Sequence, residues 1–252
     1  MKKKIVTIGI VGCGRVFNHY VKIFNKRKKD DFKIIVVCDK DKIKANAASK
    51  IFKCKKIFSY SEMLKIYKNK LDLIIILTPS GSHFVQSMQA LKNNFNVLCE
   101  KPATMLSNDA LKIDKLSKKK NLMFGIAFQN RFNKSVVTLK KLHEKNKFGK
   151  ILLVNVRLLW SRYQNYYNDK WHGRWKTDGG VTNQQAIHHI DVTRWIFGPI
   201  SEVNSIMTNQ INKLQAEDTN NSIVKFKSGA TGSIQVTTAV RPEDLSASLE
   251  VI

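Results

Sequence analysis

Acidic residues are scarce in this sequence. Its 252 residues include 19 Asp+Glu against 44 Lys+Arg, which gives a formal net charge of +25. Such an excess admits nucleic-acid binding through phosphate neutralisation. However, the lysines are spread in short groups, without an Arg-rich or aromatic-interleaved stripe and without a nucleic-acid module. We therefore favour a generally lysine-rich composition, which can also steer small anions to a site, and expect no nucleic-acid partner.

Cysteines and long apolar runs are also few. The four cysteines, Cys13, Cys38, Cys54 and Cys99, show no Cys-x-x-Cys spacing, and three fall in or beside expected strands. This usage is typical of unpaired thiols in a reducing compartment, so we expect a cytoplasmic protein. No stretch approaches the ~20 apolar residues of a membrane span, so we expect no membrane partner.

The first half of the chain alternates strand-like and helical segments. We predict strands over residues 5–11, 33–38, 71–77, 96–99 and 122–127, and helices over residues 15–28, 43–52, 62–67, 83–93 and 108–119. The near-continuous apolar run Leu73–Leu77 is typical of a strand that is covered on both faces. These βαβ units predict an α/β Rossmann fold, a doubly wound parallel sheet, over residues 1–128.

The regular alternation of strand-like and helical segments ends after residue 128. We predict a strand over residues 151–160, an irregular aromatic-rich stretch over 161–180, and a helix over 182–197 that ends at Gly198-Pro199. Further strands are predicted over residues 203–208, 221–227, 231–238 and 246–252. Residues 129–252 therefore predict an α+β domain with a mostly antiparallel sheet. Because the sequence ends within a strand, we expect that sheet to be incomplete at its C-terminal side.

A glycine-rich turn joins the first strand to the first helix. Gly12 permits a tight turn, and Gly14 lets the backbone approach a pyrophosphate at the start of the helix. Phe17 replaces the third glycine of the usual fingerprint, and Asp39 ends the next strand further along than the usual ~20 residues. A carboxylate there accepts hydrogen bonds from the adenosine ribose and repels a 2′-phosphate. We therefore expect NAD rather than NADP; the alternative is a loop that merely turns the chain.

Two polar segments follow consecutive strands of the first half. They are Thr78-Pro79-Ser80-Gly81-Ser82-His83 and Glu100-Lys101-Pro102, and both should lie at the carboxyl edge of the sheet, where open α/β folds bind ligands. Pro102 fixes the backbone just past the lysine. Lys101 could instead be a surface lysine in a salt bridge, but its place at a strand end favours a functional role.

These segments, together with Gln129-Asn130-Arg131-Phe132 and the run 178–191 (DGGVTNQQAIHHID), resemble the Gfo/Idh/MocA oxidoreductases. That family includes glucose–fructose oxidoreductase and inositol dehydrogenases. Within it, the stretch 171–175 (WHGRW) and the Asn-Gln helix are similar to members that act on sugars or nucleotide sugars. The resemblance covers essentially the whole chain.

The resemblance implies an NAD-dependent oxidoreductase that transfers a hydride between a ring hydroxyl carbon of a sugar or nucleotide sugar and the nicotinamide. Lys101 would orient the reacting hydroxyl, and His188 would act as the acid/base. Family members commonly carry an aspartate four residues before that histidine, where this chain has Gln184. This departure puts the proton path in doubt more than the reaction class.

The glycine turn and the resemblance together give the expected binding residues. Cofactor contacts are expected from Gly12, Gly14, Arg15, Val16, Asp39, Thr78, Pro79, His83, Glu100, Lys101 and Gln129. Substrate contacts are expected from Lys101, Arg131, Tyr166, Trp175, Asn183, Gln184 and His188.

Some alternatives remain open. His188 could be a packing residue with Asp191 or His189 as its partner. Because adjacent residues such as His188 and His189 point to different helix faces, we expect no metal site. The aromatic and cationic cluster at residues 160–175 could bind sugar and phosphate, or could pack as a loop. The other functional interpretations are an inositol dehydrogenase and a truncated dinucleotide-binding remnant without catalysis. We expect a homo-oligomer, a dimer or a tetramer.

Overall fold

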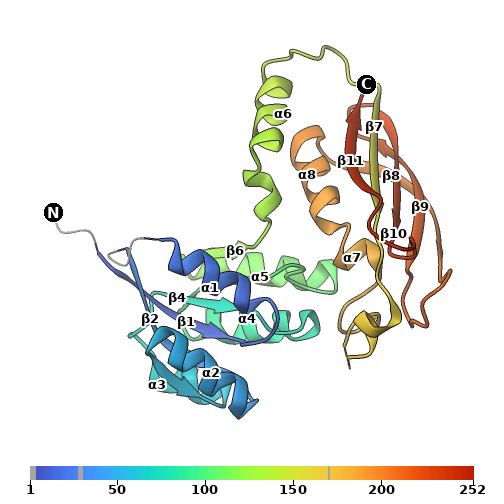
Figure 1. Ribbon diagram of the computed structural model, residues 1–252. Helices are drawn as coiled ribbons and strands as arrows, with labels where there is room; N and C mark the ends of the chain where they lie inside the picture. Colours follow the sequence, from blue (N-terminus) through green and yellow to red (C-terminus); the bar gives the residue numbers. More distant parts are fainter. Residues whose placement is uncertain (1–3, 28–30, 170) are drawn as a thin grey trace. The chain divides into compact units, whose positions relative to one another are not determined.

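The computed structural model describes residues 4–27, 31–169 and 171–252. The chain divides into two compact units, unit 1 (Met1–Ala127) and unit 2 (Phe128–Ile252) (Figure 1). Each unit has a sheet and a hydrophobic core of its own.

Within the described part of unit 1, a six-stranded parallel sheet forms the centre. Its strands are β1 (Val6–Val11), β2 (Phe32–Cys38), β3 (Lys55–Ile57), β4 (Leu73–Ile76), β5 (Asn96–Cys99) and β6 (Phe124–Ile126). Their order is β3-β2-β1-β4-β5-β6, so the order reverses between β1 and β4. The predicted doubly wound parallel sheet is confirmed, and a reversal of this kind is where such folds bind ligands.

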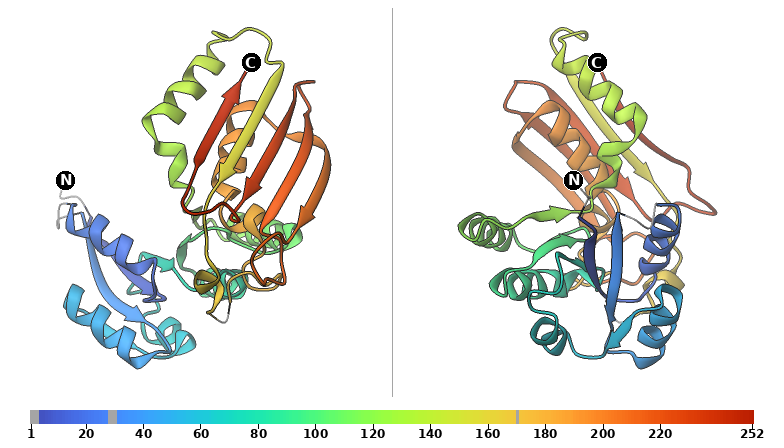
Figure 2. Two further views of the ribbon diagram at one scale, coloured as in Figure 1. Left: turned by 45° about the vertical axis from the view of Figure 1, so that its right-hand side comes forward. Right: turned by 90° about the vertical axis from the view of Figure 1, so that its left-hand side faces the viewer.

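Helices cover both faces of this sheet (Figures 1 and 2). They are α1 (Phe17–Asn25), α2 (Lys42–Phe52), α3 (Tyr60–Ile66), α4 (His83–Lys92) and α5 (Ser107–Lys119), with a 3-10 turn η1 (Ser80–Ser82) before α4. Alternate residues of β4 face opposite ways: Ile75 packs with α1 and α2, whereas Ile74 and Ile76 pack with α3, α4 and α5. Two buried faces explain the near-continuous apolar run of this strand. The first helix is shorter than predicted, and Lys28, the expected last residue, lies outside the described residues.

Unit 2 contains a five-stranded mixed sheet in its described residues. Its strands are β7 (Leu153–Leu159), β8 (Ile200–Thr208), β9 (Thr219–Phe226), β10 (Thr231–Thr237) and β11 (Ser246–Val251), in the order β11-β7-β10-β9-β8. The β7–β10 pair is parallel and the other three pairs are antiparallel. The prediction of a mostly antiparallel sheet is confirmed, and β7, the first strand in the chain, lies between β10 and β11.

Helices α6 (Lys134–Glu144) and α8 (Ile187–Phe197) cover one face of this sheet (Figures 1 and 2). The core between them combines α8 residues such as Ile196 with strand residues such as Leu158 and Phe226. The continuous helix predicted over 182–197 is instead two helices, because α7 (Val181–Gln184) ends before α8 begins. Short 3-10 turns, η2 (Gln129–Phe132) and η3 (Gln164–Tyr167), complete the unit.

Candidate active site

Gly12 and Gly14 of the glycine turn in unit 1 have different surroundings. Gly12 has φ +92°, and a Cβ there would lie 2.7 Å from the Leu77 carbonyl carbon and 2.8 Å from the Thr78 nitrogen. Its own N–H donates to the Cys38 carbonyl at 2.8 Å. A Cβ on Gly14, in contrast, would meet no atom within 4 Å. Gly12 is therefore required by the packing of the protein itself, whereas Gly14 leaves an open backbone face.

Helix α1 follows directly, and its N-cap residue, Val16, makes no side-chain cap hydrogen bond. The first N–H groups of a helix bind anions well when no side chain caps them. An open backbone at Gly14 beside an uncapped helix start fits a pyrophosphate. The structure therefore contains the backbone arrangement that a dinucleotide needs.

Asp39 lies just past β2 and contacts the glycine turn. Its Oδ2 accepts a hydrogen bond from the Cys13 N–H at 2.7 Å, and its Oδ1 accepts one from the Asp41 N–H at 2.9 Å. A carboxylate offers about four acceptor positions, so Asp39 can brace the turn and still accept ribose hydroxyls. The expected role in ribose binding is compatible with this geometry and stays a prediction.

The segments after β4 and β5 are joined by a buried histidine. His83 is 1% exposed, and its Nδ1 and Nε2 lie 2.7 Å from the Pro102 oxygen and 2.6 Å from the Thr78 oxygen. Both ring nitrogens are thus engaged by backbone carbonyls. The ring therefore links the two loops, and the expected contact of His83 with the cofactor stays a prediction.

Glu100 is also held within unit 1. Its Oε1 accepts from the Tyr20 hydroxyl at 3.0 Å, and its Oε2 accepts from the Lys101 backbone N–H at 3.1 Å. Tyr20 is not among the predicted site residues, because nothing in the sequence connects this residue of α1 with a residue that follows β5. The peptide bond between Lys101 and Pro102 is cis. Lys101 itself is partly exposed, at the carboxyl end of β5 as predicted.

In unit 2, the motif that begins at Asp178 is organised by that carboxylate. Asp178 is 1% exposed and accepts a hydrogen bond from the Gly173 N–H at 2.7 Å. The Gln184 side-chain amide donates to the same carboxylate, and the Asn183 amide donates to the Asp178 carbonyl at 2.9 Å. The two predicted substrate residues of α7 are therefore gathered around Asp178. This partner carboxylate was missed, although Asp178 stands in the quoted motif.

The two glycines after Asp178 have distinct structural reasons. Gly179 has φ +74°, which favours glycine. A Cβ on Gly180 would lie 2.4 Å from the backbone oxygen of Glu217. That close approach lets the Glu217 carbonyl accept from the Val181 N–H at 3.0 Å and its carboxylate accept from the Thr182 N–H at 3.1 Å. The glycines thus fix where α7 begins.

His188 lies in the first turn of α8, and its ring makes an edge contact with Phe128, with ring centroids 6.2 Å apart. The neighbouring His189 packs its ring edge toward Trp160 instead, at 6.5 Å. Burial lowers the pKa of His189 below its usual value, which favours a neutral ring. The two histidines thus occupy different surroundings, as expected for adjacent helix residues.

Arg131 forms an ion pair with Asp191, which lies on α8. Its Nε donates to Asp191 Oδ2 at 2.7 Å, and its Nη2 donates to Oδ1 at 2.5 Å. The guanidinium also lies over the rings of Phe128 and Trp195, at 5.7 and 5.3 Å. This bidentate pair joins η2 to α8. The substrate contact expected of Arg131 stays a prediction.

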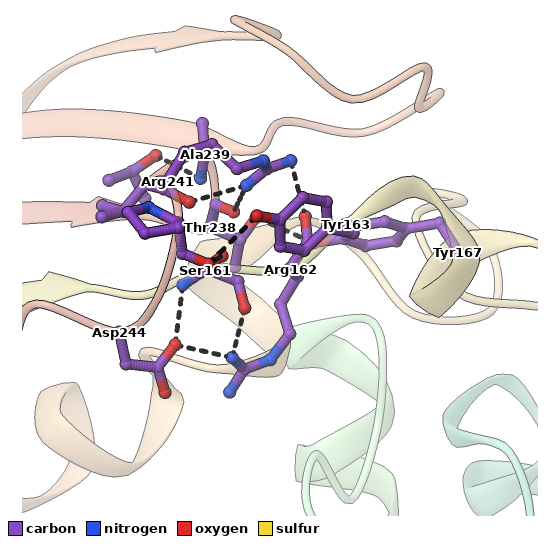
Figure 3. A network of polar contacts seen from close by, with 11 residues as sticks. Ser161, Arg162, Tyr163, Tyr167, Thr238, Ala239, Arg241 and Asp244 are labelled. Atoms are coloured by element: carbon purple, nitrogen blue, oxygen red, sulfur yellow. Dashed lines mark hydrogen bonds and ion pairs between the residues drawn. The ribbon is translucent and has the colours of Figure 1, made fainter.

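Part of the aromatic and cationic cluster at residues 160–175 takes part in a network of polar contacts between loops (Figure 3). Arg162 donates to Asp244 at 2.8 Å and to the Ser161 carbonyl at 2.6 Å. Arg241 donates to the carbonyls of Arg162, Thr238 and Val240 and to the Asn212 side chain. The Tyr163 ring covers the Arg241 guanidinium at 4.2 Å. Arg162 and Arg241 therefore brace loops, which favours the packing interpretation for this part of the cluster.

The remaining predicted residues are spread over several elements. Tyr166 packs against Tyr167 and His172, with centroids 5.0 and 4.5 Å away. Trp175 is 50% exposed, and Gln129 is exposed at the start of η2. Arg15, Thr78 and Pro79 lie in the loops at the carboxyl ends of β1 and β4.

Two family models divide the chain between them. The model described as an oxidoreductase family with an NAD-binding Rossmann fold matches residues 6–128, and the GFO/IDH/MocA C-terminal domain matches residues 136–252. The chain belongs to the Gfo/Idh/MocA oxidoreductase family. The resemblance found in the sequence is thereby confirmed, and unit 1 is the NAD-binding Rossmann domain of this family member.

The chain is also similar to individual relatives. The WlbA dehydrogenase of Chromobacterium violaceum, solved in complex with NADH and UDP-GlcNAcA, is 32% identical with a TM-score of 0.96, and the match covers 100% of this chain and 72% of that one. Myo-inositol 2-dehydrogenase of Thermotoga maritima is 24% identical over 90% of this chain and 67% of its own. The oxidoreductase YteT of Bacillus subtilis is 24% identical over 75% of this chain. The matched part is 46% of YteT, about half of that relative's length.

Among the residues that the structure describes, no helix is long and apolar enough to cross a membrane. In the same residues, no group of three His, Cys, Asp or Glu side chains is placed to hold a metal ion.

Proposed function

We propose that this chain is an NAD-dependent oxidoreductase acting on CH–OH groups, which transfers a hydride between a ring hydroxyl carbon of a sugar or nucleotide sugar and the nicotinamide. The observation that carries this proposal is the similarity, over 100% of the chain, to a dehydrogenase solved with NADH and a UDP-linked sugar acid. The open backbone at Gly14 and the lysine at the carboxyl end of β5 support it.

Residues of unit 1 would hold the cofactor. The backbone from Gly14 to Val16 would bind the pyrophosphate, and the Asp39 carboxylate would accept hydrogen bonds from the adenosine ribose. The negative charge of Asp39 favours NAD over NADP, because it repels a 2′-phosphate. Arg15, Thr78 and Pro79 would add contacts from the loops after β1 and β4, and Gln129 of unit 2 is expected to add a further contact.

The reaction needs one group that binds the hydroxyl oxygen and one that removes its proton. NAD, when bound, supplies the hydride acceptor. The Lys101 ammonium would donate a hydrogen bond to the hydroxyl oxygen, where negative charge develops. His188 would take the hydroxyl proton, since histidine titrates near neutral pH. Gln184, held by Asp178, would position a substrate hydroxyl.

The preferred substrate is a nucleotide sugar that carries a carboxylate. The formal net charge of +25 favours the approach of an anionic substrate. Asn183, Tyr166, Trp175 and Arg131 would line its site. A second candidate is a polyol, inositol, because the Thermotoga inositol dehydrogenase matches 90% of the chain.

Unit 2 would also support assembly. Apolar side chains on β8 are exposed, with Val203 at 62% and Ile206 at 70%. Because an exposed apolar sheet face commonly becomes an interface, we propose a homo-oligomer, a dimer or a tetramer, in the cytoplasm.

Titration of the purified protein with NAD and NADP at moderate salt tests the proposal. We expect saturable NAD binding that weakens in Asp39→Ala, and NADH formation from NAD with UDP-GlcNAcA that is lost in Lys101→Ala. NADH formation with inositol alone would favour the second candidate. Failure of a folded sample to bind either cofactor would contradict the oxidoreductase proposal, and NAD binding without turnover of either substrate would favour a dinucleotide-binding remnant.

A further inference from the structure

The residues on both sides of Lys101 are tied to other elements of unit 1. On the N-terminal side, the Glu100 N–H donates to the Ile76 carbonyl at 3.0 Å, which continues the sheet register past β5. The Glu100 carboxylate then bridges the Tyr20 hydroxyl, at 3.0 Å, and the Lys101 N–H, at 3.1 Å. Tyr20 lies on α1, the helix that begins at the glycine turn. One hydrogen bond therefore connects that helix with the lysine segment.

On the C-terminal side, Pro102 is buried and its carbonyl lies 2.7 Å from His83 Nδ1. The other ring nitrogen lies 2.6 Å from the Thr78 carbonyl, so the ring spans the loops after β4 and β5. Carbonyl oxygens only accept hydrogen bonds, so a neutral ring, which carries one N–H, donates to one of the two carbonyls at a time, whereas a protonated ring donates to both. Burial lowers the pKa of His83, while the two carbonyls and the Glu100 carboxylate oppose that effect and the Lys101 ammonium adds to it.

We propose that Tyr20 and His83 are positioning residues for Lys101, which hold the backbone on either side of it so that its ammonium is presented from one fixed point. Lysine has a long flexible stem, and a fixed Cα reduces the number of positions that its charge can occupy. The use of this lysine in hydride transfer rests on the proposed function. The restraint on Lys101 is a separate property that can be measured without activity.

The Tyr20 hydroxyl is suited to this role. Burial is the largest cause that raises the pKa of Tyr20, and the adjacent Glu100 carboxylate raises it further. The hydroxyl therefore stays protonated and donates to Glu100 throughout the neutral range. Substitution by phenylalanine removes this donor and keeps the ring.

The test compares Tyr20→Phe and His83→Gln with Tyr60→Phe in the full chain. Tyr60 is a matched control, because its partly buried hydroxyl donates to the Gln86 carbonyl at 2.8 Å rather than to the Glu100 carboxylate. Each protein is acetylated by a water-soluble active ester over a range of pH without cofactor. The rate at Lys101 is measured by peptide mass spectrometry, with exposed Lys118 as the internal reference.

We expect the pH midpoint of Lys101 acetylation to shift in Tyr20→Phe and His83→Gln, while Tyr60→Phe and every Lys118 rate match the wild type. An unchanged Lys101 profile in both variants overturns the proposal. If His83→Gln does not fold, Tyr20→Phe decides the question, because it deletes one oxygen atom.

A kinetic measurement separates positioning from general damage. With a substrate that the wild type turns over, we expect Tyr20→Phe to lower kcat by roughly 10- to 100-fold, because misplacement of a reacting group causes a loss of this size. The Kd for NADH should change little. An equal fall in Tyr60→Phe would overturn the positioning role. Absence of turnover in the wild type would contradict the proposed function and leave the acetylation result intact.

Discussion

The lysine segment of unit 1 and the 161–180 stretch of unit 2 are both irregular, but they are held in different ways. The lysine segment directly follows β5, and the Glu100 N–H still bonds to Ile76 as a further rung of the sheet. The 161–180 stretch lies between β7 and α7, and side chains such as Asp178 and Arg241 hold its backbone. Sheet register therefore brings the first segment to its place, where Tyr20 and His83 add hydrogen bonds, whereas hydrogen bonds from side chains to the backbone hold the second.

The difference explains which site residues were foreseeable. A polar residue that follows a buried strand is recognisable in a sequence, because the strand end is marked by the loss of the apolar pattern. A loop that is held by a buried carboxylate shows no comparable change of pattern in the sequence. We expect substitutions to expose this contrast: the stability of unit 1 should be most sensitive to the backbone at Gly12, and the stability of the 161–180 stretch should be most sensitive to the loss of side-chain hydrogen bonds.

The largest effect should come from Gly12→Ala. The positive φ and the contacts of a Cβ with the Leu77 and Thr78 backbone predict a loss of roughly 1–3 kcal/mol or more in the free energy of unfolding, together with loss of NAD binding. Gly14→Ala is the matched control, because its Cβ meets nothing within 4 Å. It should keep the unfolding temperature and weaken NAD binding. Equal unfolding temperatures for the two variants would contradict the division of roles between the glycines.

Asp178→Asn should have the next largest effect. The substitution weakens the buried acceptor of the Gly173 N–H and the Gln184 amide, which predicts a loss of about 1–3 kcal/mol in the free energy of unfolding by denaturant. Asp114→Asn, at an exposed site bonded to Lys118, should cost less than about 0.5 kcal/mol. A loss at Asp178 as small as at Asp114 would show that the backbone, not this carboxylate, holds the stretch.

Arg241→Lys should have a smaller effect. A lysine ammonium cannot span the acceptors of Arg162, Val240 and Asn212 as the planar guanidinium does (Figure 3), so we expect a loss of about 1–2 kcal/mol. Limited proteolysis between residues 161 and 167 should accelerate. Arg174→Lys, at an exposed site of the same stretch, provides the comparison and should cleave at the wild-type rate.

The smallest effect concerns the edge of the unit 1 sheet where β1 and β4 begin. Hydrogen bonds from the Lys4 ammonium, which has the largest effect, and from the Thr7 N–H and hydroxyl lower the pKa of Asp72 to about 2. Because the folded pKa is below the unfolded value of about 3.9, the stabilisation is present above that value and is lost as the pH falls from about 4 toward about 2.

Solvent screens the exposed Lys4, so we expect Asp72→Asn to cost less than about 1 kcal/mol at neutral pH. The variant should also lose less stability than the wild type between about pH 4 and pH 2, as measured by thermal unfolding. Parallel pH curves for the two proteins would exclude this carboxylate as a source of acid sensitivity.

Several elements of the fold were predictable and others were not. β5 was predicted with its observed bounds, since its apolar run lies between polar turns. β3 has three residues, two of them lysines, and gives no strand pattern. Helix α6 was missed although Val136 and Leu139 have helical spacing and pack into the core of unit 2. The break between α7 and α8 carries no glycine or proline, so the sequence predicted one continuous helix.

The sequence by itself determined the alternation of strands and helices in unit 1 apart from β3, the tight turn at Gly12, and the motifs that mark the family. These features depend on residues that are neighbours along the chain. The tertiary structure decided which polar side chains stay available for ligands. Arg131 pairs with Asp191, 60 residues away, and His83 bonds to a carbonyl 19 residues away. A buried polar group is stable only with a hydrogen-bond partner, and folding chooses that partner from residues that the local sequence pattern does not bring together.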